Sequence, residues 1–187
     1  MNHFFAIEIS ADTRHSVAAY SDHWRTQLGV RHDLHWLNPS DYHITLKFLG
    51  DTPRDEALLL SGEAQRIAHR YGPLQVRQAQ TGAFPTLEKP RVLWAGVARN
   101  FELESLAGAL DRLAAAAGYP PERRPYHPHI TLARAAGRPV APAIPNELLF
   151  VPWDARGFVL MEIGPPKETE DNGRIRYNTV QVFPFSK

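Results

Sequence analysis

Two copies of the tetrad His-Ile-Thr-Leu contain the residues of this chain that are best suited to chemistry. They lie nearly half of the 187-residue chain apart. A single His-x-Thr means little, but repetition of the whole tetrad is a specific signal. A pair of imidazoles, which titrate near neutral pH, can act as general acid and general base, and threonine hydroxyls can donate hydrogen bonds to a bound anion. The polar positions are His43, Thr45, His129 and Thr131.

Each tetrad has the alternation of a β-strand, in which side chains at i and i+2 share a face. Each His and Thr should therefore face a cleft, while Ile and Leu face a core. The same alternation predicts that residue 133 continues the polar face of the second strand, so that Arg134 reaches the site from the strand end. A guanidinium there would neutralise charge on a phosphoryl group. The pattern indicates phosphate-ester chemistry by general acid–base catalysis.

His127 leaves an alternative open. With His129 it forms a His-x-His pair, and His43 would complete a three-histidine metal site. Pro128 interrupts regular strand geometry at this point, and no carboxylate stands at an evident position for a fourth ligand.

Two aromatic residues, Phe84 and Tyr126, are predicted to lie on loops near the tetrads. Exposed aromatic rings there would stack on a nucleic-acid base, and the alternative is that both rings pack against the core. Arg123 and Arg124, just before the second tetrad, form the strongest local basic patch.

Composition narrows the class of protein. The chain is long enough for one domain, and 43% of its residues are hydrophobic. It has no cysteine, which excludes disulfides, a thiol nucleophile and cysteine metal sites. The net charge of +1 means that a polyanion would have to meet a local basic patch. The first residues, MNHFFAIEIS, have no basic leader and only a short apolar run, so we expect a soluble cytoplasmic protein.

Periodicity and turn residues predict an antiparallel α+β fold, with two strand-and-helix halves side by side. Residues 81–90 are expected to form a loop, and Asn172-Gly173 marks a hairpin tip. Helices are expected over about 12–28, 53–71 and 101–117, with a short helical turn near 146–149. Strands are expected over 3–9, 34–37, 42–49, 74–80, 91–97, 156–163 and 174–183, and at the second tetrad.

The paired motifs HITLKFLG and PHITLAR resemble the signature of the 2H phosphoesterase superfamily. The stretches FFAIEI, LHWLNPSDYHITLKFLG, TGAFP, RVLWAGV and RPYHPHITLARA resemble, in the same order, the pattern of its bacterial and archaeal RNA 2′,3′-cyclic phosphodiesterases, also called 2′-5′ RNA ligases. RIRYNTVQVFPF resembles the final strand of that family, so the resemblance covers nearly the whole chain.

The resemblance implies a bilobal α+β fold with two antiparallel sheets related by a pseudo-twofold axis, helices on the outside and a central cleft. Residues 1–187 would form one domain of two interleaved lobes. The implied activity is hydrolysis of terminal RNA 2′,3′-cyclic phosphates to 2′-phosphates, without metal or cofactor, by a protein expected to be a monomer that does not bind membranes. Run in reverse, the same site would join a cyclic phosphate to a 5′-hydroxyl.

Carried over from the family, His43 would be the proton donor to the leaving 3′-oxygen and His129 the base that activates water. Thr45, Thr131 and Arg134 would hold the phosphate, with Phe84 and Tyr126 as further substrate-binding residues. Two alternatives remain: a phosphodiesterase acting on another cyclic or 2′-5′ linked nucleotide, and a non-catalytic RNA-end-binding protein. Binding alone would not require a titrating pair of histidines.

Overall fold

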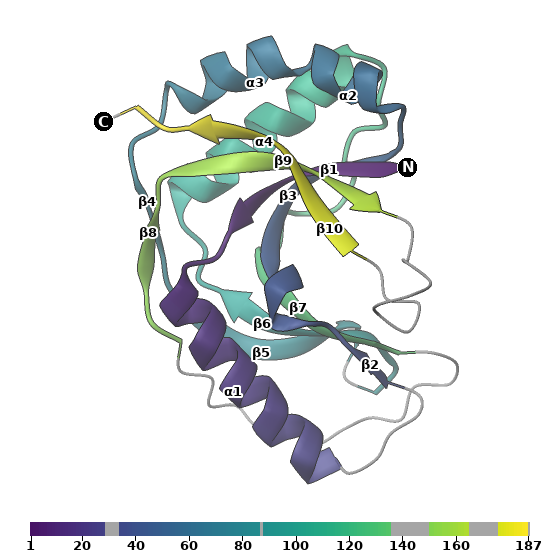
Figure 1. Cartoon of the computed structure of the whole chain (residues 1–187), viewed down its shortest axis with the longest axis vertical. Coiled ribbons are helices and arrows are strands. Elements are labelled where there is room, and N and C mark those ends of the chain that lie inside the picture. Colours follow the sequence, from purple (N-terminus) through teal and green to yellow (C-terminus); the bar gives the residue numbers. More distant parts are fainter. Residues whose placement is uncertain (29–33, 87, 136–149, 165–175, 187) are drawn as a thin grey trace.

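The computed structural model describes residues 1–28, 34–86, 88–135, 150–164 and 176–186 (Figure 1). The helices are α1 (Ala11–Leu28), α2 (Arg54–Leu59), α3 (Ser61–Ala68) and α4 (Phe101–Ala116), with a 3₁₀ turn η1 (Pro39–Asp41). The strands are β1 (Asn2–Glu8), β2 (Leu34–Trp36), β3 (His43–Asp51), β4 (Leu74–Val76), β5 (Gln78–Pro85), β6 (Pro90–Val97), β7 (His129–Ala135), β8 (Trp153–Ala155), β9 (Gly157–Gly164) and β10 (Arg176–Pro184).

The main sheet consists of two halves that meet at one point. Its order is β10-β9-β1-β3-β7-β6-β5, with β2 added to β7, and β4 and β8 form a separate pair; all these pairings are antiparallel. Neighbouring strands within each half pair over several residues, whereas β3 and β7 share the single pair Ile44–Ile130. The antiparallel α+β class is therefore confirmed, and the two antiparallel halves of the main sheet join inside the two tetrads.

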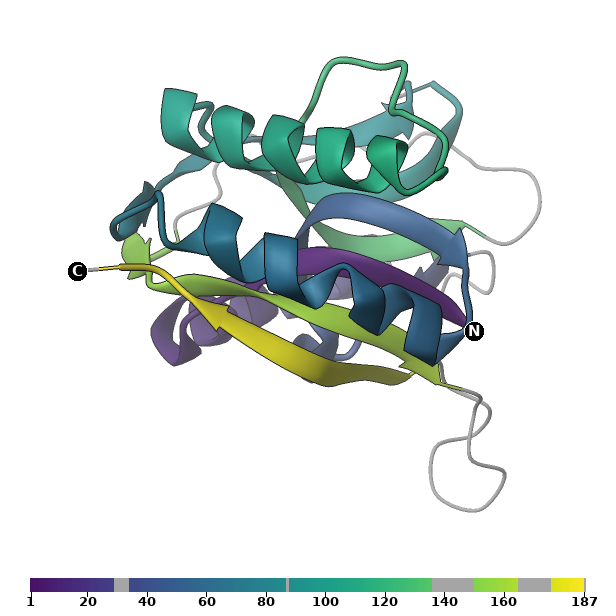
Figure 2. The same ribbon diagram turned by 90° about the horizontal axis from the view of Figure 1, so that it is seen from above.

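The helices cover the two halves from outside (Figures 1 and 2). Helices α2, α3 and α4 lie over β1, β3, β9 and β10, and Ser61 of α3 is hydrogen bonded to Gln181 of β10 at 2.7 Å. Helix α1 lies over the other half, where Trp24 meets Trp36 of β2 with ring centroids 5.9 Å apart. Helix α1 follows β1 in the sequence but packs on the half that contains β6, and α4 follows β6 but packs on the half that contains β1. Each of these two helices therefore lies on the half opposite to its preceding strand.

Local sequence explains helix α4, which the site later requires. The Asn100 side chain caps it by accepting the Leu103 N–H at 2.6 Å. Leucines at helical spacing face the core, and Leu103, Leu106 and Leu110 are fully buried. Gly118, with φ of +93°, follows its end. Among the described helices, none combines the length and apolarity needed to cross a membrane.

The structure differs from the predicted elements in three places. The helix expected over 53–71 is two helices, interrupted before Ser61-Gly62, a pair that commonly breaks helices. The prediction of a loop over 81–90 is wrong for residues 81–85, because β5 continues to Pro85 and pairs with β6, which begins at Pro90. The segment before β9 forms the separate strand β8, which pairs with β4. The helical turn near 146–149 and the hairpin tip at Asn172-Gly173 lie outside the described residues.

Candidate active site

The pair between β3 and β7 brings the polar residues of both tetrads to one side. Ile44 and Ile130 lie opposite one another and are fully buried. Residues next to such partners point to the other face of a sheet. We call that side the motif face. It contains the four flanking residues, each partly exposed: His43, Thr45, His129 and Thr131.

An extra residue interrupts the alternation of β3 directly after this polar pair. In the pairing with β1, residues 45 and 47 have partners and Leu46 has none, as in a β-bulge. Leu46 and Lys47 are consequently both buried, and Phe48 is 51% exposed. The Phe48 ring lies 6.4 Å from the ring of Phe4, which itself contacts a motif histidine.

Strand β7 has the same interruption at the same place. In the pairing with β6, residues 131 and 133 have partners and Leu132 has none. Leu132 and Ala133 are both fully buried, whereas Arg134 is exposed. The prediction that residue 133 continues the polar face is therefore wrong, because the extra residue transfers that position to Arg134. Arg134 and Phe48 are equivalent, each five residues after its histidine.

Each motif histidine is held by the backbone carbonyl two residues before it. His43 Nδ1 lies 2.7 Å from Asp41 O, and His129 Nδ1 lies 2.7 Å from His127 O. A carbonyl can only accept, so each Nδ1 must donate, which fixes the proton of the neutral ring there. Nε2 then has the lone pair, and it is the atom that can take up or deliver a proton.

Burial beside aromatic rings keeps His43 neutral. Its ring centroid lies 4.9 Å from that of Phe4 and 5.0 Å from that of Tyr177. Burial lowers the pKa of His43 to about 4, although its hydrogen bond to a carbonyl acts to raise it. Arg134 and His129 lower the same pKa further. A negative charge must therefore come close before this ring holds a proton at neutral pH.

His129 has a similar environment on the other half. Its ring centroid lies 5.0 Å from that of Phe84 and 6.2 Å from that of Trp94. Burial lowers the pKa of His129, its carbonyl partner raises it, and His127 and Arg134 lower it. Since Arg134 affects both motif histidines, its guanidinium lies within electrostatic reach of both.

Trp94 is an aromatic residue close to the site that the sequence analysis did not identify. It faces Gly82, where a Cβ atom would come within 2.3 Å of the indole ring. Only a glycine in β5 leaves room for this ring next to His129. The TGAFP stretch therefore contributes a site-shaping strand.

Phe84 and Tyr126 were both predicted to lie on loops and to bind substrate, and only Tyr126 lies outside the strands. Phe84 lies in β5, half-buried, with its ring next to His129. Tyr126 lies outside the strands, and its hydroxyl donates to the backbone carbonyl of Thr45 at 3.1 Å while its ring packs against the core. Burial raises the pKa of Tyr126. Its hydroxyl is therefore engaged by the protein itself.

Other groups on the motif face lack such partners. Within the described part of the chain, the hydroxyls of Thr45 and Thr131 have no hydrogen-bond partner.

Three aromatic residues near His43 were not identified from the sequence: Phe4, Phe48 and Tyr177. The signal that would have found Phe48 is its spacing from His43, which matches that of Arg134 from His129.

His127 does not combine with the motif histidines into a set of metal ligands. The rings of His127 and His129 are stacked 6.4 Å apart, and His127 meets its neighbour through a carbonyl oxygen. Across the described residues, no three or more His, Cys, Asp or Glu side chains gather closely enough to hold a metal ion. The geometry therefore does not support the three-histidine alternative.

Comparison with known proteins agrees with this fold. The model of the 2'-5' RNA ligase superfamily matches residues 13–164. The RNA 2',3'-cyclic phosphodiesterase of Bacillus subtilis (strain 168) is 37% identical over 130 residues, covering 68% of this chain and 71% of that protein. That of Geobacillus stearothermophilus is 29% identical over 184 residues, covering 98% of this chain but 57% of that protein. This chain thus spans little more than half of the Geobacillus relative.

A solved structure of Escherichia coli LigT complexed with 3'-AMP superposes with a TM-score of 0.75 at 27% identity, covering 100% of this chain and 98% of that one. The two antiparallel halves of the main sheet, each contributing one His-x-Thr strand to a shared face, give the fold that this chain shares with LigT. More specifically, the chain belongs to the 2'-5' RNA ligase superfamily.

Proposed function

We propose that this protein hydrolyses terminal RNA 2′,3′-cyclic phosphates to 2′-phosphates by acid–base catalysis between two histidines. The observation that supports this most directly is the matched tethering of His43 and His129, each with Nδ1 on a backbone carbonyl and Nε2 available. The names of the relatives, RNA 2',3'-cyclic phosphodiesterase, support the same substrate class. The 3'-AMP in the LigT complex supports a nucleotide as ligand.

In the proposed reaction, water attacks phosphorus and gives its proton to His129 Nε2. The bond between phosphorus and the 3′-oxygen breaks, and that oxygen takes a proton from His43 Nε2. Thr45, Thr131 and Arg134 hold the phosphate oxygens, and Arg134 neutralises charge that develops on them. The assignment of donor and acceptor rests on the family resemblance, because the two tethers are alike.

We further propose roles for two aromatic residues, a reverse reaction and a monomeric protein. Phe84 stacks on a base of the substrate, and Tyr126 contributes by holding the backbone of Thr45. Reversal of the reaction would join a 2′,3′-cyclic phosphate to a 5′-hydroxyl. The protein acts as a monomer on RNA ends.

The experiment that tests the function is hydrolysis of a nucleoside 2′,3′-cyclic phosphate in excess chelator, with identification of the product isomer. We expect full activity and a 2′-phosphate, because the proposed site uses two histidines, two threonines and an arginine. Loss of activity in chelator with recovery in zinc would contradict the proposal. Faster turnover of another cyclic or 2′-5′ linked nucleotide would identify that nucleotide as the substrate instead. Binding of RNA ends without turnover would show that the protein is a non-catalytic RNA-end binder.

We also expect a bell-shaped dependence of rate on pH. One histidine must be charged and the other neutral, so kcat/KM should be greatest between their two pKa values, below about 6.5. A bound phosphate favours the charged imidazole and raises both pKa values, so the optimum of kcat should lie at higher pH. Both limbs belong to the coupled pair. Enzyme pre-incubated at each pH and assayed at one reference pH controls for unfolding, and rates flat from about pH 5 to 9 would contradict histidine catalysis.

A further inference from the structure

Lys47 is a buried charge that the proposed chemistry does not use. It follows the first tetrad directly, and 6% of its side chain is exposed. The equivalent residue after the second tetrad is the small apolar Ala133. A buried ammonium group is costly unless it is paired and hydrogen bonded. The groups that pair with Lys47 therefore indicate what this charge holds in place.

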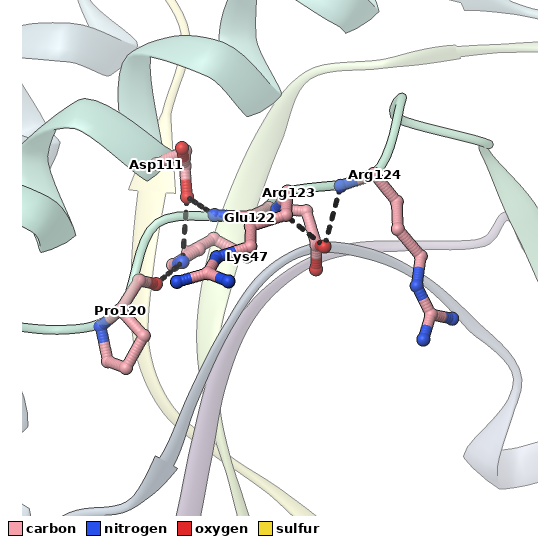
Figure 3. Close-up of polar contacts among 6 residues, drawn as sticks. All are labelled: Lys47, Asp111, Pro120, Glu122, Arg123 and Arg124. Carbon is pink, nitrogen blue, oxygen red and sulfur yellow. Dashed lines mark hydrogen bonds and ion pairs between the residues drawn. The ribbon is translucent and has the colours of Figure 1, made fainter.

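Lys47 Nζ donates to Asp111 Oδ1 of α4 and to the backbone carbonyl of Pro120, each at 2.7 Å (Figure 3). The same Oδ1 atom accepts the backbone N–H of Glu122 at 2.9 Å. Partial burial acts to raise the pKa of Asp111, but the hydrogen bonds from Lys47 and Glu122 lower it, so the carboxylate stays charged.

Both backbone groups belong to the stretch 117–128, which we call the α4–β7 segment. Within it, the Glu122 side chain accepts the N–H groups of the next two residues at 2.9 and 3.0 Å (Figure 3). Further along, the Tyr126 hydroxyl attaches the segment to the Thr45 carbonyl. The strand of the first tetrad thus holds, at two places, the segment that leads into the second tetrad.

The α4–β7 segment contains, one residue before its end, the carbonyl that orients His129. That carbonyl belongs to His127, and the next one, of Pro128, accepts the Val97 N–H at 3.1 Å. Strand β6 therefore holds this part of the segment on one side. Toward β3, the attachments of the segment add to a single backbone pair between β3 and β7. Placement matters, because a displacement of about 1 Å can cost roughly a hundredfold in rate.

Resting on the proposed function, we propose that Lys47 is a positioning residue for His129. It fixes the α4–β7 segment on the first-tetrad strand, so that the His127 carbonyl holds His129 with Nε2 directed at the phosphate. Asp111 completes the arrangement by binding both the ammonium group and the segment.

The test replaces the buried pair with apolar side chains, Lys47→Met together with Asp111→Leu. Such replacements are commonly neutral or stabilising, so the double variant should stay folded while losing its bonds to Pro120 and Glu122. In the substrate-free protein, we expect the ¹⁵N NMR signals of His129 to change from the Nδ1–H tautomer to a mixture. The pKa of His129 should fall, because the carbonyl that raises it is no longer fixed. We expect kcat to drop about tenfold or more, with KM changed much less.

Two controls make the result specific. His43 is tethered by Asp41 in η1, outside the α4–β7 segment, so its NMR signals should be unchanged. Glu63→Gln, which removes an exposed ion pair with Arg66 on α3, should change neither histidine. If the double variant does not fold, Lys47→Met alone serves, because Asp111 is partly exposed and keeps its bond to Glu122.

Wild-type tautomer and pKa of His129 in a folded variant would overturn the proposal, as would a shift of His43 of the same size. The NMR measurement uses free protein. If the protein did not hydrolyse cyclic phosphates, the NMR measurement would therefore still show whether Lys47 positions His129. If it did hydrolyse them and the NMR signals of His129 were unaffected in the variant, only the proposed role of Lys47 would be refuted.

Discussion

His43→Ala should lose about 10²- to 10⁴-fold in turnover of a 2′,3′-cyclic phosphate and regain much of that rate on an analogue with sulfur at the 3′ position. A ribose alkoxide leaves poorly unless it is protonated as it departs. A thiolate, whose conjugate acid has a pKa of about 8.5, leaves with little help from an acid. The measurement is kcat for both substrates with the original protein and the variant.

The matched comparison for that experiment is His129→Ala, which should stay slow on the sulfur analogue because water still needs a base. The rate of the unaltered enzyme on the analogue shows whether sulfur disturbs binding. Rescue of His129→Ala instead of His43→Ala would reverse the two roles. Rescue of neither would mean that the histidines mainly hold the phosphate.

His129→Asn should lose turnover by a similar factor, about 10²- to 10⁴-fold, without loss of folding. The asparagine amide N–H can replace Nδ1 as the donor to the His127 carbonyl, so the local structure is retained. What disappears is Nε2, the proposed acceptor for the proton of water. Turnover should be measured together with the thermal midpoint, which we expect to be close to that of the original protein.

Affinity for a product nucleotide separates catalysis from binding in this variant. If His129 acts as the base, His129→Asn should bind a 2′-phosphate almost as tightly as the original protein at a pH above the pKa of His129 in the complex, where the imidazole is uncharged. A loss of affinity as large as the loss of turnover would instead assign His129 to phosphate holding. More than a tenth of the original turnover would contradict the role of base.

The sequence was sufficient for the tetrads and for most of the elements that position them. Local alternation and turn residues are properties of short stretches, so they can be read before folding. The helix 101–117 and the strand beginning at His129 therefore match α4 and β7 closely.

The sequence was insufficient where pairing between distant strands decides the outcome. The extra residue at Leu132 exists only in relation to β6, so strict alternation assigned the polar face to residue 133 in place of Arg134. Gly82 looked like a loop residue because its reason, the ring of Trp94 on the next strand, is a tertiary contact. Nothing in the sequence alone marks Lys47, because its partners lie in α4 and the segment after it.

The carbonyl tethers of His43 and His129 have a consequence for variation in this family of sites. Where a carboxylate orients a histidine, one point mutation can delete the orienting group. Here the orienting atoms are main-chain oxygens at positions 41 and 127, and every amino acid supplies one. Side chains at those two positions are thus free to change without removing either hydrogen bond. Mutations can therefore alter the surroundings of the two histidines, while the main-chain carbonyls still hold the Nδ1 proton of each ring in the same direction.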